Sequence, residues 1–323
     1  MATLITGGAG FVGSHLVDRR VALGEHVIVI DNLLTGRLAN LEGPLATGKA
    51  TFIYHDVAAP LDRLRAAIAS ATSEPLEKIF HLASPASPEA YGAYPWETLA
   101  VNGMGTMALI ELALEHHAAL LFTSTSEVYG DPLVHPQPES YFGNVNPIGP
   151  RACYDEGKRF GEAAISVAVR ERGLDGRIVR IFNCYGPRMD IGDGRLLPAF
   201  LSAAREGRPL PIHGTGRQTR SLTYIDDLID GLCCVSESRA AGLQPVNLGS
   251  EEEQSINEIA SVFAQTLGIP LQMQSLPARP EDPQRRRPVI SVARSLGWSP
   301  KISLHEGLRR TYAWFMDETL QPV

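Results

Sequence analysis

The segment Thr6–Gly13, TGGAGFVG, decides the fold of this 323-residue chain. Its glycines are spaced G-x-x-G-x-x-G, after an apolar, strand-like run at Thr3–Thr6 and before an amphipathic, helix-like run at Phe11–Leu23. Glycines at this spacing let the backbone turn sharply and approach a pyrophosphate, whose charge the helix N-terminus receives. An ordinary glycine-rich turn is the alternative, but a strand before and a helix after are the context that a dinucleotide site requires. The segment therefore predicts a dinucleotide-binding turn.

Outward from this turn, short apolar runs alternate with longer amphipathic stretches through the first half of the chain. This alternation is typical of parallel strands joined by crossover helices, so we expect an α/β doubly wound parallel sheet, a Rossmann domain, over residues 1–182. The strand-like runs are Thr3–Thr6, Val27–Ile30, Thr51–Tyr54, Ile79–Ala83, Leu120–Thr123 and Arg177–Phe182, and the helix-like ones are Phe11–Leu23, Leu61–Ala71, Trp96–His116 and a stretch starting near Tyr154.

Beyond Asn183 the pattern changes to loops punctuated by glycine and proline. We expect a smaller, C-terminal substrate-binding lobe over residues 183–323, from which residues 221–250 return to the main domain through a strand-like run at Pro245–Gly249. Short helices are expected in this half at Leu196–Arg205, Ile225–Ser236, Ile256–Leu267 and Leu304–Phe315.

Composition narrows the classes of partner. The formal charge of −7 argues against a nucleic-acid binder, which normally has a basic surplus. No apolar run approaches the ~20 residues that span a bilayer, and the N-terminus lacks a signal-peptide layout, so no membrane association and a cytoplasmic location are expected. The cysteines match neither a zinc cluster nor a disulfide framework, so they are expected to be reduced and mostly buried, and no metal is expected.

An acidic residue ends the second strand-like run. Asp31 is placed to accept hydrogen bonds from the adenosine ribose and to repel a 2′-phosphate, which favours NAD over NADP. Arg37, a few residues later, favours NADP instead. The predicted cofactor-binding residues are Gly7, Gly10, Phe11, Val12, Gly13, Asp31, Asn32, Asp56, Val57, Leu82, Ala83, Tyr154 and Lys158.

Tyr154 and Lys158 form Y-x-x-x-K, which puts both side chains on one face of a helix, one turn apart. A phenol with a pKa near 10 needs roughly 4 kcal/mol of extra stabilisation of its phenolate to become a base at pH 7. We expect the neighbouring ammonium and a positive nicotinamide to supply it. Thr125 and Ser126 follow the strand-like run at Leu120–Thr123, where open α/β sheets hold their ligands, although such hydroxyls also cap backbone groups.

These segments resemble the extended short-chain dehydrogenase/reductases over nearly the whole chain. Within this group, the chain resembles one branch more closely, the UDP-glucuronate decarboxylases or UDP-xylose synthases. The segments that carry this second resemblance are HLASPASP at His81–Pro88, TSTSEVYGDP at Thr123–Pro132, NPIGPRACYDEGKR at Asn146–Arg159, QTRS at Gln218–Ser221 and DPQRRRP at Asp282–Pro288.

The resemblance implies that Tyr154 takes the C4 hydroxyl proton of UDP-glucuronate while hydride passes to NAD⁺, after which the 4-keto sugar loses CO₂. It also implies that Glu127 assists ring distortion and proton handling, that Arg286 is associated with the substrate carboxylate, and that the protein is a homodimer. The catalytic residues are thus expected to be Tyr154, Lys158, Thr125, Ser126, Glu127 and Arg286. The expected substrate contacts are Pro85, Ser126, Glu127, Tyr154, Asn183, Arg188, Arg220 and Arg286, with Tyr185 a weaker candidate.

Two alternatives stay open. After its G-P-R-M segment, this chain has Asp190 where the branch usually has His, and Pro198-Ala199 where it has Ser-Asn, which brings it closer to the nucleotide-sugar 4-epimerases. An epimerase would oxidise C4 in the same way but return hydride to the opposite face, giving UDP-galacturonate. Glu127 and Arg286 favour decarboxylation. A non-catalytic NAD-binding scaffold is the other alternative, since fold does not imply function, and the intact Tyr154 and Lys158 argue against it.

Overall fold

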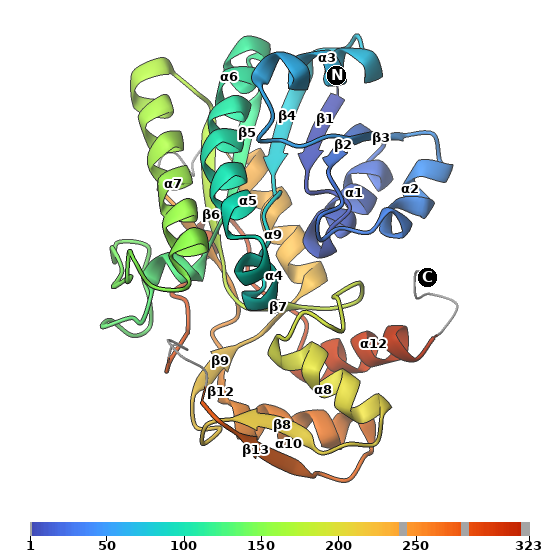
Figure 1. Ribbon diagram of the computed structural model, residues 1–323, viewed down its shortest axis with the longest axis vertical. Coiled ribbons are helices and arrows are strands. Elements are labelled where there is room, and N and C mark those ends of the chain that lie inside the picture. Colours follow the sequence, from blue (N-terminus) through green and yellow to red (C-terminus); the bar gives the residue numbers. More distant parts are fainter. Residues whose placement is uncertain (1, 239–243, 279–283, 318–323) are drawn as a thin grey trace.

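The computed structural model describes residues 2–238, 244–278 and 284–317, so Asp282 and Pro283 of the DPQRRRP segment lie outside the described residues. Its centre is a seven-stranded parallel sheet with the strand order β11-β6-β5-β4-β1-β2-β3 (Figure 1). This confirms the doubly wound architecture. The strands are β1 (Ala2–Thr6), β2 (His26–Asp31), β3 (Ala50–Tyr54), β4 (Leu76–His81), β5 (Ala119–Thr125), β6 (Gly176–Ile181) and β11 (Val246–Leu248).

Both faces of the sheet are covered by helices, and the strands show why. Val27 and Val29 of β2 pack into one apolar core, whereas Ile28 and Ile30 pack into the core on the opposite face. A strand buried on both sides must be apolar at every position, which is why it reads as a continuous run. The flanking helices are α1 (Phe11–Ala22), α2 (Glu42–Ala46), α3 (Leu61–Ala71), α6 (Thr106–His116), α7 (Ala152–Arg172) and α9 (Ile225–Glu237).

The stretch predicted as one helix over Trp96–His116 consists of three continuous segments. α5 (Pro95–Ala100) leads into a π-helical turn, η2 (Val101–Gly105), and then into α6. In the π turn, the buried Asn102 side chain donates hydrogen bonds to the Ser84 hydroxyl and to the Thr98 carbonyl, each over 2.9 Å. The turn thereby links this helix to the loop after β4.

The second lobe is built around α8 (Leu196–Arg205), α10 (Ile256–Leu267) and α12 (Leu304–Met316), all at positions that the sequence predicted. Its three strand pairs were not predicted, because two to four residues are too few to show a period. They are β7 (Cys184–Tyr185) with β10 (Thr223–Tyr224), β9 (Thr219–Ser221) with β12 (Glu253–Ser255), and β8 (Leu210–His213) with β13 (Met273–Leu276). The remaining short elements are η1 (Leu38–Leu41), α4 (Pro88–Ala93), η3 (Ser126–Tyr129) and α11 (Ser291–Ser295).

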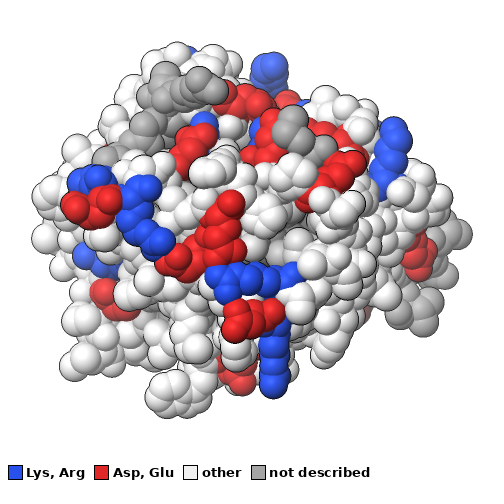
Figure 2. Space-filling model, turned by 90° about the horizontal axis from the view of Figure 1, so that it is seen from above, with Lys and Arg blue, Asp and Glu red and all other residues white. Residues whose placement is uncertain are grey.

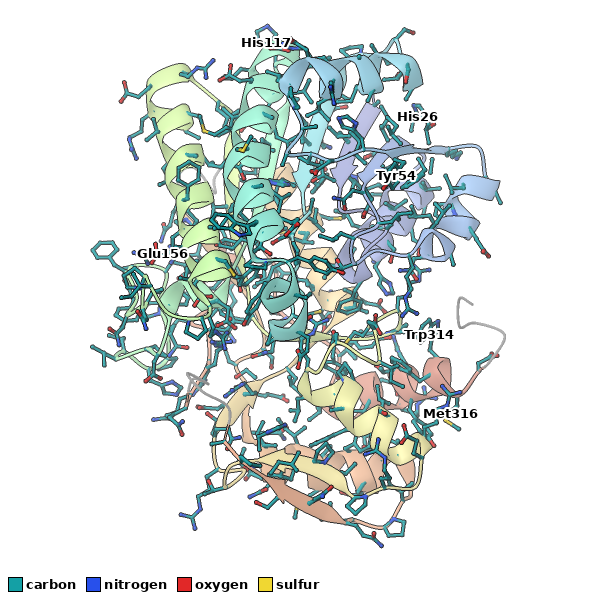
Figure 3. The ribbon with its side chains drawn as sticks, in the orientation of Figure 1. His26, Tyr54, His117, Glu156, Trp314 and Met316 are labelled. Carbon is teal, nitrogen blue, oxygen red and sulfur yellow. The ribbon has the colours of Figure 1, made fainter. Side chains whose placement is uncertain are left out.

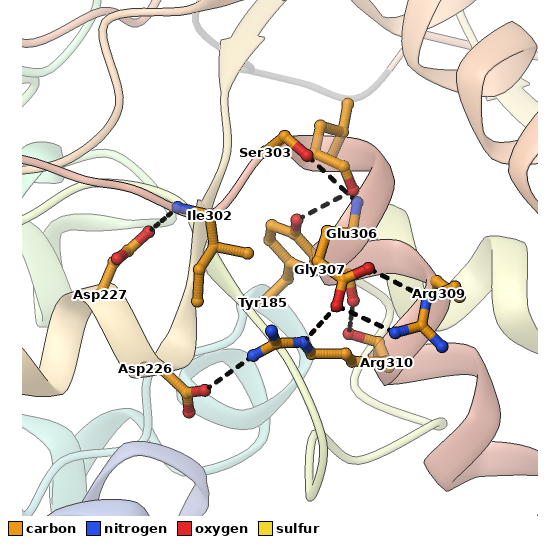
Figure 4. A network of polar contacts seen from close by, with 11 residues as sticks. Tyr185, Asp226, Asp227, Ile302, Ser303, Glu306, Gly307, Arg309 and Arg310 are labelled. Carbon is orange, nitrogen blue, oxygen red and sulfur yellow. Dashed lines mark hydrogen bonds and ion pairs between the residues drawn. The ribbon is translucent and has the colours of Figure 1, made fainter.

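The two halves of the chain are interleaved. β11 pairs with β6, and α9 packs beside α1, so residues 225–237 and 246–248 belong to the main sheet and its helices. The division between domains at residue 183 stays a prediction. Figure 4 shows how α12 is tied to α9: Asp227 accepts a hydrogen bond from the Ile302 backbone N–H at 2.8 Å, just before α12, and Arg310 of α12 lies 3.5 Å from the carboxylate of Asp226.

The surface carries both signs of charge. On the face in Figure 2, basic side chains are interspersed with acidic ones. Among the described helices, none combines the length and the apolar character that a membrane crossing needs. The four cysteines, expected to be mostly buried, are free thiols of intermediate exposure.

The predicted dinucleotide-binding turn at Thr6–Gly13, called the nucleotide turn below, leaves no room for a side chain at Gly13. A Cβ there would lie 2.1 Å from the Gly7 carbonyl oxygen, a backbone atom that cannot rotate away. We therefore expect Gly13→Ala to lower the free energy of unfolding by about 1–3 kcal/mol through overpacking and to weaken NAD binding. Thermal unfolding and calorimetric titration measure the two effects. Gly43→Ala on α2 is the control, because its methyl group would meet no atom within 4 Å, and a Gly13→Ala protein as stable as this control would contradict the prediction.

Candidate active site

Two hollows lie at the carboxyl ends of the central strands, where the strand order reverses between β1 and β4. The first, which we call the cofactor cavity, has a volume of about 660 Å³. The second, the catalytic cleft, has a volume of about 270 Å³ and shares Phe11, Val12 and Leu82 with the first. Predicted residues that line the cofactor cavity are Gly7, Gly10, Phe11, Val12, Gly13, Asp31, Asn32, Asp56, Val57, Leu82 and Ala83.

The glycine turn suits a pyrophosphate. Gly7 has a φ of +72°, and a Cβ there would lie 2.6 Å from the Ala83 nitrogen, so the turn fits directly against the end of β4. Gly10 is the N-cap of α1 and provides no side-chain cap, and a Cβ on it would meet only the Gly7 carbonyl oxygen, at 3.3 Å. The absence of a side chain thus keeps the helix N-terminus accessible from the cavity, as an anionic cofactor requires.

Asp31 is held in place by the backbone. Its buried carboxylate accepts hydrogen bonds from the Ala9 N–H at 3.0 Å and the Leu33 N–H at 2.8 Å. Burial raises the pKa of Asp31, and the two hydrogen bonds act in the opposite direction. Each carboxylate oxygen keeps a lone pair for a further donor, so the geometry suits ribose hydroxyls at this end of the cavity.

Tyr154 and Lys158 lie one turn apart on α7, with both side chains buried in the catalytic cleft. Lys158 Nζ donates a hydrogen bond to the Thr123 carbonyl at 2.8 Å and lies 5.9 Å from the centre of the Tyr154 ring. Burial lowers the pKa of Lys158 to about 7.

Glu156, labelled on α7 in Figure 3, is partly exposed and paired with Arg159 at 3.6 Å.

The surroundings that the chain itself gives Tyr154 favour the neutral phenol. Burial raises the pKa of the phenol, and Glu127 and Asp155 raise it further, against a hydrogen bond with Thr125 and the charge of Arg195. Burial is the largest of these effects. Stabilisation of the phenolate by Lys158 and a positive nicotinamide stays a prediction.

Thr125 has the two functions that the sequence presented as alternatives. Its hydroxyl caps η3 by accepting a hydrogen bond from the Glu127 N–H at 3.2 Å, and it also lies beside the Tyr154 phenol, whose pKa it acts to lower. Capping therefore fixes the threonine beside the phenol rather than competing with a function in the cleft.

Glu127 joins three distant parts of the chain. Its carboxylate accepts two hydrogen bonds from Arg286, one of them over 2.8 Å, and another from Arg151. Burial alone would raise the pKa of Glu127, but the guanidinium groups of Arg286, Arg151 and Arg220 lower it below its ordinary value. Glu127 is thus an ionised, partly buried carboxylate between two arginines.

Three residues near Tyr154 were not predicted, and two of them, Tyr91 and Arg151, line the catalytic cleft. Tyr91 of α4 stacks on the Tyr154 ring, with 5.1 Å between centroids, and Arg151 lies over the Tyr91 ring. Asp155, next to Tyr154, has a pKa raised by burial and then by Glu127. Tyr91 follows the HLASPASP segment, and Arg151 and Asp155 are part of NPIGPRACYDEGKR. The sequence thus contained these residues close to recognised segments, but it did not predict that their side chains lie near Tyr154.

The predicted substrate contacts divide between the two hollows. Ser126, Asn183, Arg220 and Arg286 line the catalytic cleft together with Glu127 and Tyr154. Pro85 and Arg188 line the cofactor cavity instead, and Arg188 Nη1 is 2.7 Å from the carboxylate of Asp18.

Tyr185, the weaker candidate, is buried in the core of the lobe. Its hydroxyl donates a hydrogen bond to the Leu304 carbonyl at 3.2 Å. Within the described parts of the chain, no group of three or more His, Cys, Asp or Glu side chains is arranged to hold a metal.

The arrangement has counterparts among known proteins. The NAD dependent epimerase/dehydratase family profile matches residues 3–249. UDP-glucuronic acid decarboxylase 1 of Xenopus tropicalis is 45% identical over 316 residues, which are 98% of this chain and 72% of that protein. The structure of UDP-glucose 4-epimerase from Thermotoga maritima with UDP-glucose has a TM-score of 0.88 at 30% identity and covers 99% of this chain and 100% of its own.

A second solved structure is that of a UDP-glucuronic acid 4-epimerase from Bacillus cereus, in complex with UDP-4-deoxy-4-fluoro-glucuronic acid and NAD. It has a TM-score of 0.84 at 28% identity and covers 97% of this chain and 98% of its own. Proteins similar to this chain thus include both a decarboxylase and epimerases.

Tyr154→Phe tests the proton acceptor. The substitution keeps the ring that stacks on Tyr91 and removes only the hydroxyl, so we expect hydride transfer from a UDP-sugar to NAD⁺ to slow by roughly 10²–10⁴-fold, with substrate affinity nearly unchanged. Single-turnover NADH absorbance and calorimetry measure these quantities. Tyr185→Phe removes a buried hydroxyl outside the cleft and should leave the rate intact. If Tyr154→Phe retained most of the wild-type rate, another group would have to be the base.

Proposed function

This chain belongs to the NAD-dependent epimerase/dehydratase family, and on that premise we propose that it oxidises UDP-glucuronate at C4 and then decarboxylates it to UDP-xylose. It is an NAD-dependent nucleotide-sugar enzyme. The observation that carries the decarboxylation is the contact between Glu127 and Arg286 in the cleft, which brings an arginine from 159 positions away to the side where Tyr154 lies.

The chain's own residues account for the proton and the orientation. In the proposal, Tyr154 accepts the C4 hydroxyl proton, Thr125 keeps the phenol in position, and Lys158 stabilises the phenolate. Bound NAD⁺ supplies a hydride acceptor at C4 and the positive charge that favours the phenolate. Arg220 and Asn183 would contact the UDP portion, because a guanidinium matches phosphate oxygens in pairs.

Once C4 is a ketone, the carboxylate on C5 is β to a carbonyl. The C5–carboxylate bond breaks, its electron pair becomes an enolate that the C4 oxygen stabilises, and CO₂ leaves. A proton from solvent at C5, hydride returned to C4 and the Tyr154 proton returned to the C4 oxygen would complete the reaction and restore NAD⁺. The overall reaction is redox-neutral, so it consumes no external reductant.

Glu127 and Arg286 favour this outcome through electrostatics. Arg286 uses two of its donors on Glu127, and a guanidinium has five, so it can still bind the carboxylate of the sugar. That carboxylate would then lie close to the ionised Glu127, and loss of CO₂ would relieve the repulsion between the two negative groups.

A 4-epimerase is the second candidate. The likeness to the Bacillus cereus UDP-glucuronic acid 4-epimerase supports it, and the same Tyr154 and Lys158 would oxidise C4. Epimerisation then requires the 4-keto sugar to rotate before hydride returns to C4. It also requires the C5–carboxylate bond to be held out of line with the carbonyl π system. The proximity of Glu127 to Arg286 favours the decarboxylase.

Product mass and stereochemistry decide between the candidates. The protein is incubated with UDP-glucuronate and NAD⁺, and the product is analysed by mass spectrometry and NMR. We expect a UDP-pentose lighter by one CO₂, with the configuration of xylose. A product of unchanged mass with only C4 inverted would identify a 4-epimerase, and the absence of any product with bound NAD would favour the non-catalytic scaffold.

We also propose that the protein is a homodimer. The helices α5, η2, α6 and α7 present large apolar side chains that are 40–64% exposed, which are Leu99, Met104, Met107 and Phe160, together with Trp96, which is 78% exposed. These residues line one open hollow with Pro60 and Leu61. A continuous apolar surface of this kind is typical of an interface, and two helices from each copy would form a four-helix contact.

Met104→Glu tests the dimer. A charge in the middle of the apolar surface cannot be solvated in an interface, so the variant should sediment at the 35.0 kDa of one chain, whereas the wild type should sediment at twice that mass. Met273→Glu is the matched control, because Met273 is 48% exposed on β13, in the other lobe. A wild-type protein that sediments as a single chain at micromolar concentration would rule out the dimer.

A further inference from the structure

All arginines that line the cofactor cavity are already paired. Within the described residues of its lining, Arg37 Nη2 is 3.0 Å from Asp190 and Arg188 Nη1 is 2.7 Å from Asp18. Arg195 donates through Nε to Asp193 over 2.7 Å. A cavity with paired arginines attracts additional anionic groups less strongly than one with unpaired cations.

Arg37 differs from the other two in its position. Its backbone N–H donates to the Ala9 carbonyl at 3.0 Å, and Ala9 is part of the nucleotide turn. The preceding Gly36 runs past the acidic end of β2, so that a Cβ on it would lie 3.0 Å from a carboxylate oxygen of Asp31. Arg37 is therefore the arginine next to the carboxylate that we expect to receive the adenosine ribose.

The partner of Arg37 comes from the other half of the chain. Asp190 lies 153 positions further along, on the loop between β7 and α8 that also lines the cavity. Both side chains are about half exposed, at 50% and 46%. Such a pair is weak enough to open, so the carboxylate competes with an incoming phosphate but does not exclude it absolutely.

We propose that Asp190 is a second determinant of the preference for NAD over NADP, acting through Arg37. A 2′-phosphate on the ribose would need a cation beside it, and Arg37 is the group in place to provide one. While Arg37 is paired with Asp190, its guanidinium is not available for that phosphate. Asp31 thus disfavours the phosphate directly, and Asp190 acts by occupying the arginine. The inference rests on the proposed NAD-dependent function.

This assignment also accounts for the two opposing signals in the sequence. Asp31 favours NAD, and Arg37 by itself favours NADP. The contact with Asp190 removes the conflict, and it depends on a residue at a position where the resembled branch usually has His. Asp190 is a positioning residue here: it touches Arg37, and its effect on the cofactor passes through that side chain.

A double-mutant cycle tests the inference by binding rather than by turnover. Dissociation constants for NAD⁺ and NADP⁺ are measured by calorimetry for the wild type, Asp190→Asn, Arg37→Gln and the double variant. We expect Asp190→Asn to tighten NADP⁺ binding by about three- to tenfold, with NAD⁺ binding changed less than twofold. The gain should disappear in Asp190→Asn/Arg37→Gln, because no guanidinium remains to take the phosphate.

Asp193→Asn is the matched control, since Asp193 is also a cavity carboxylate but is paired with Arg195. It should leave the ratio of the two dissociation constants unchanged. The inference is overturned if Asp190→Asn leaves that ratio unchanged, or if it tightens NADP⁺ binding equally in the Arg37→Gln background, which would indicate simple loss of a negative charge. Failure of the wild type to bind NAD⁺ at all would instead contradict the proposed function.

Discussion

The parallel orientation of the central strands is the constraint on which the site depends. Because all strands run the same way, their carboxyl ends meet at one edge, and the reversal of strand order between β1 and β4 opens a crevice there. The glycine turn follows β1, Asp31 ends β2, and Thr125 ends β5. Right-handed crossovers return the chain to the opposite edge after each strand, so the groups that end the strands gather in one place without being close in sequence.

Buried charge is the second organising element, and it carries a stability cost. Glu127 is ionised inside the cleft because Arg286 and Arg151 donate to it. Removing one member of such a partly buried group leaves an uncompensated charge, which destabilises the folded chain. The network therefore also holds the segment at Arg286 against η3, so the proposed substrate site and this contact between distant parts of the chain depend on the same side chains.

The sequence was most informative where a long pattern repeats. The glycine turn, the buried strands and the long helices were predictable because both faces of the sheet are apolar and the helices are amphipathic. The strand pairs of the lobe and the π turn at Asn102 were not, since two to five residues show no period. Arg286 was assigned from resemblance alone, because its contact with Glu127 joins residues 159 positions apart. The stacking of Tyr91 on Tyr154 and the pairing of Arg37 with Asp190 depend on side-chain orientation, which spacing does not encode.

The electrostatics of α7 tie the chemistry to occupancy of the cofactor cavity. Burial disfavours the charged forms of both residues of the pair. It raises the pKa of Tyr154 and lowers the pKa of Lys158 to about 7. Near neutral pH the chain by itself thus favours a neutral phenol next to a partly neutral amine. A cation introduced beside them would favour the phenolate and disfavour the ammonium, so a bound positive nicotinamide would shift the balance toward the ionised phenol. Thr125 biases that balance toward the phenolate, because its hydroxyl can donate to the charged oxygen while its lone pair holds the Glu127 N–H. A base that forms only when its cofactor is present would keep the tyrosine unreactive in the free chain.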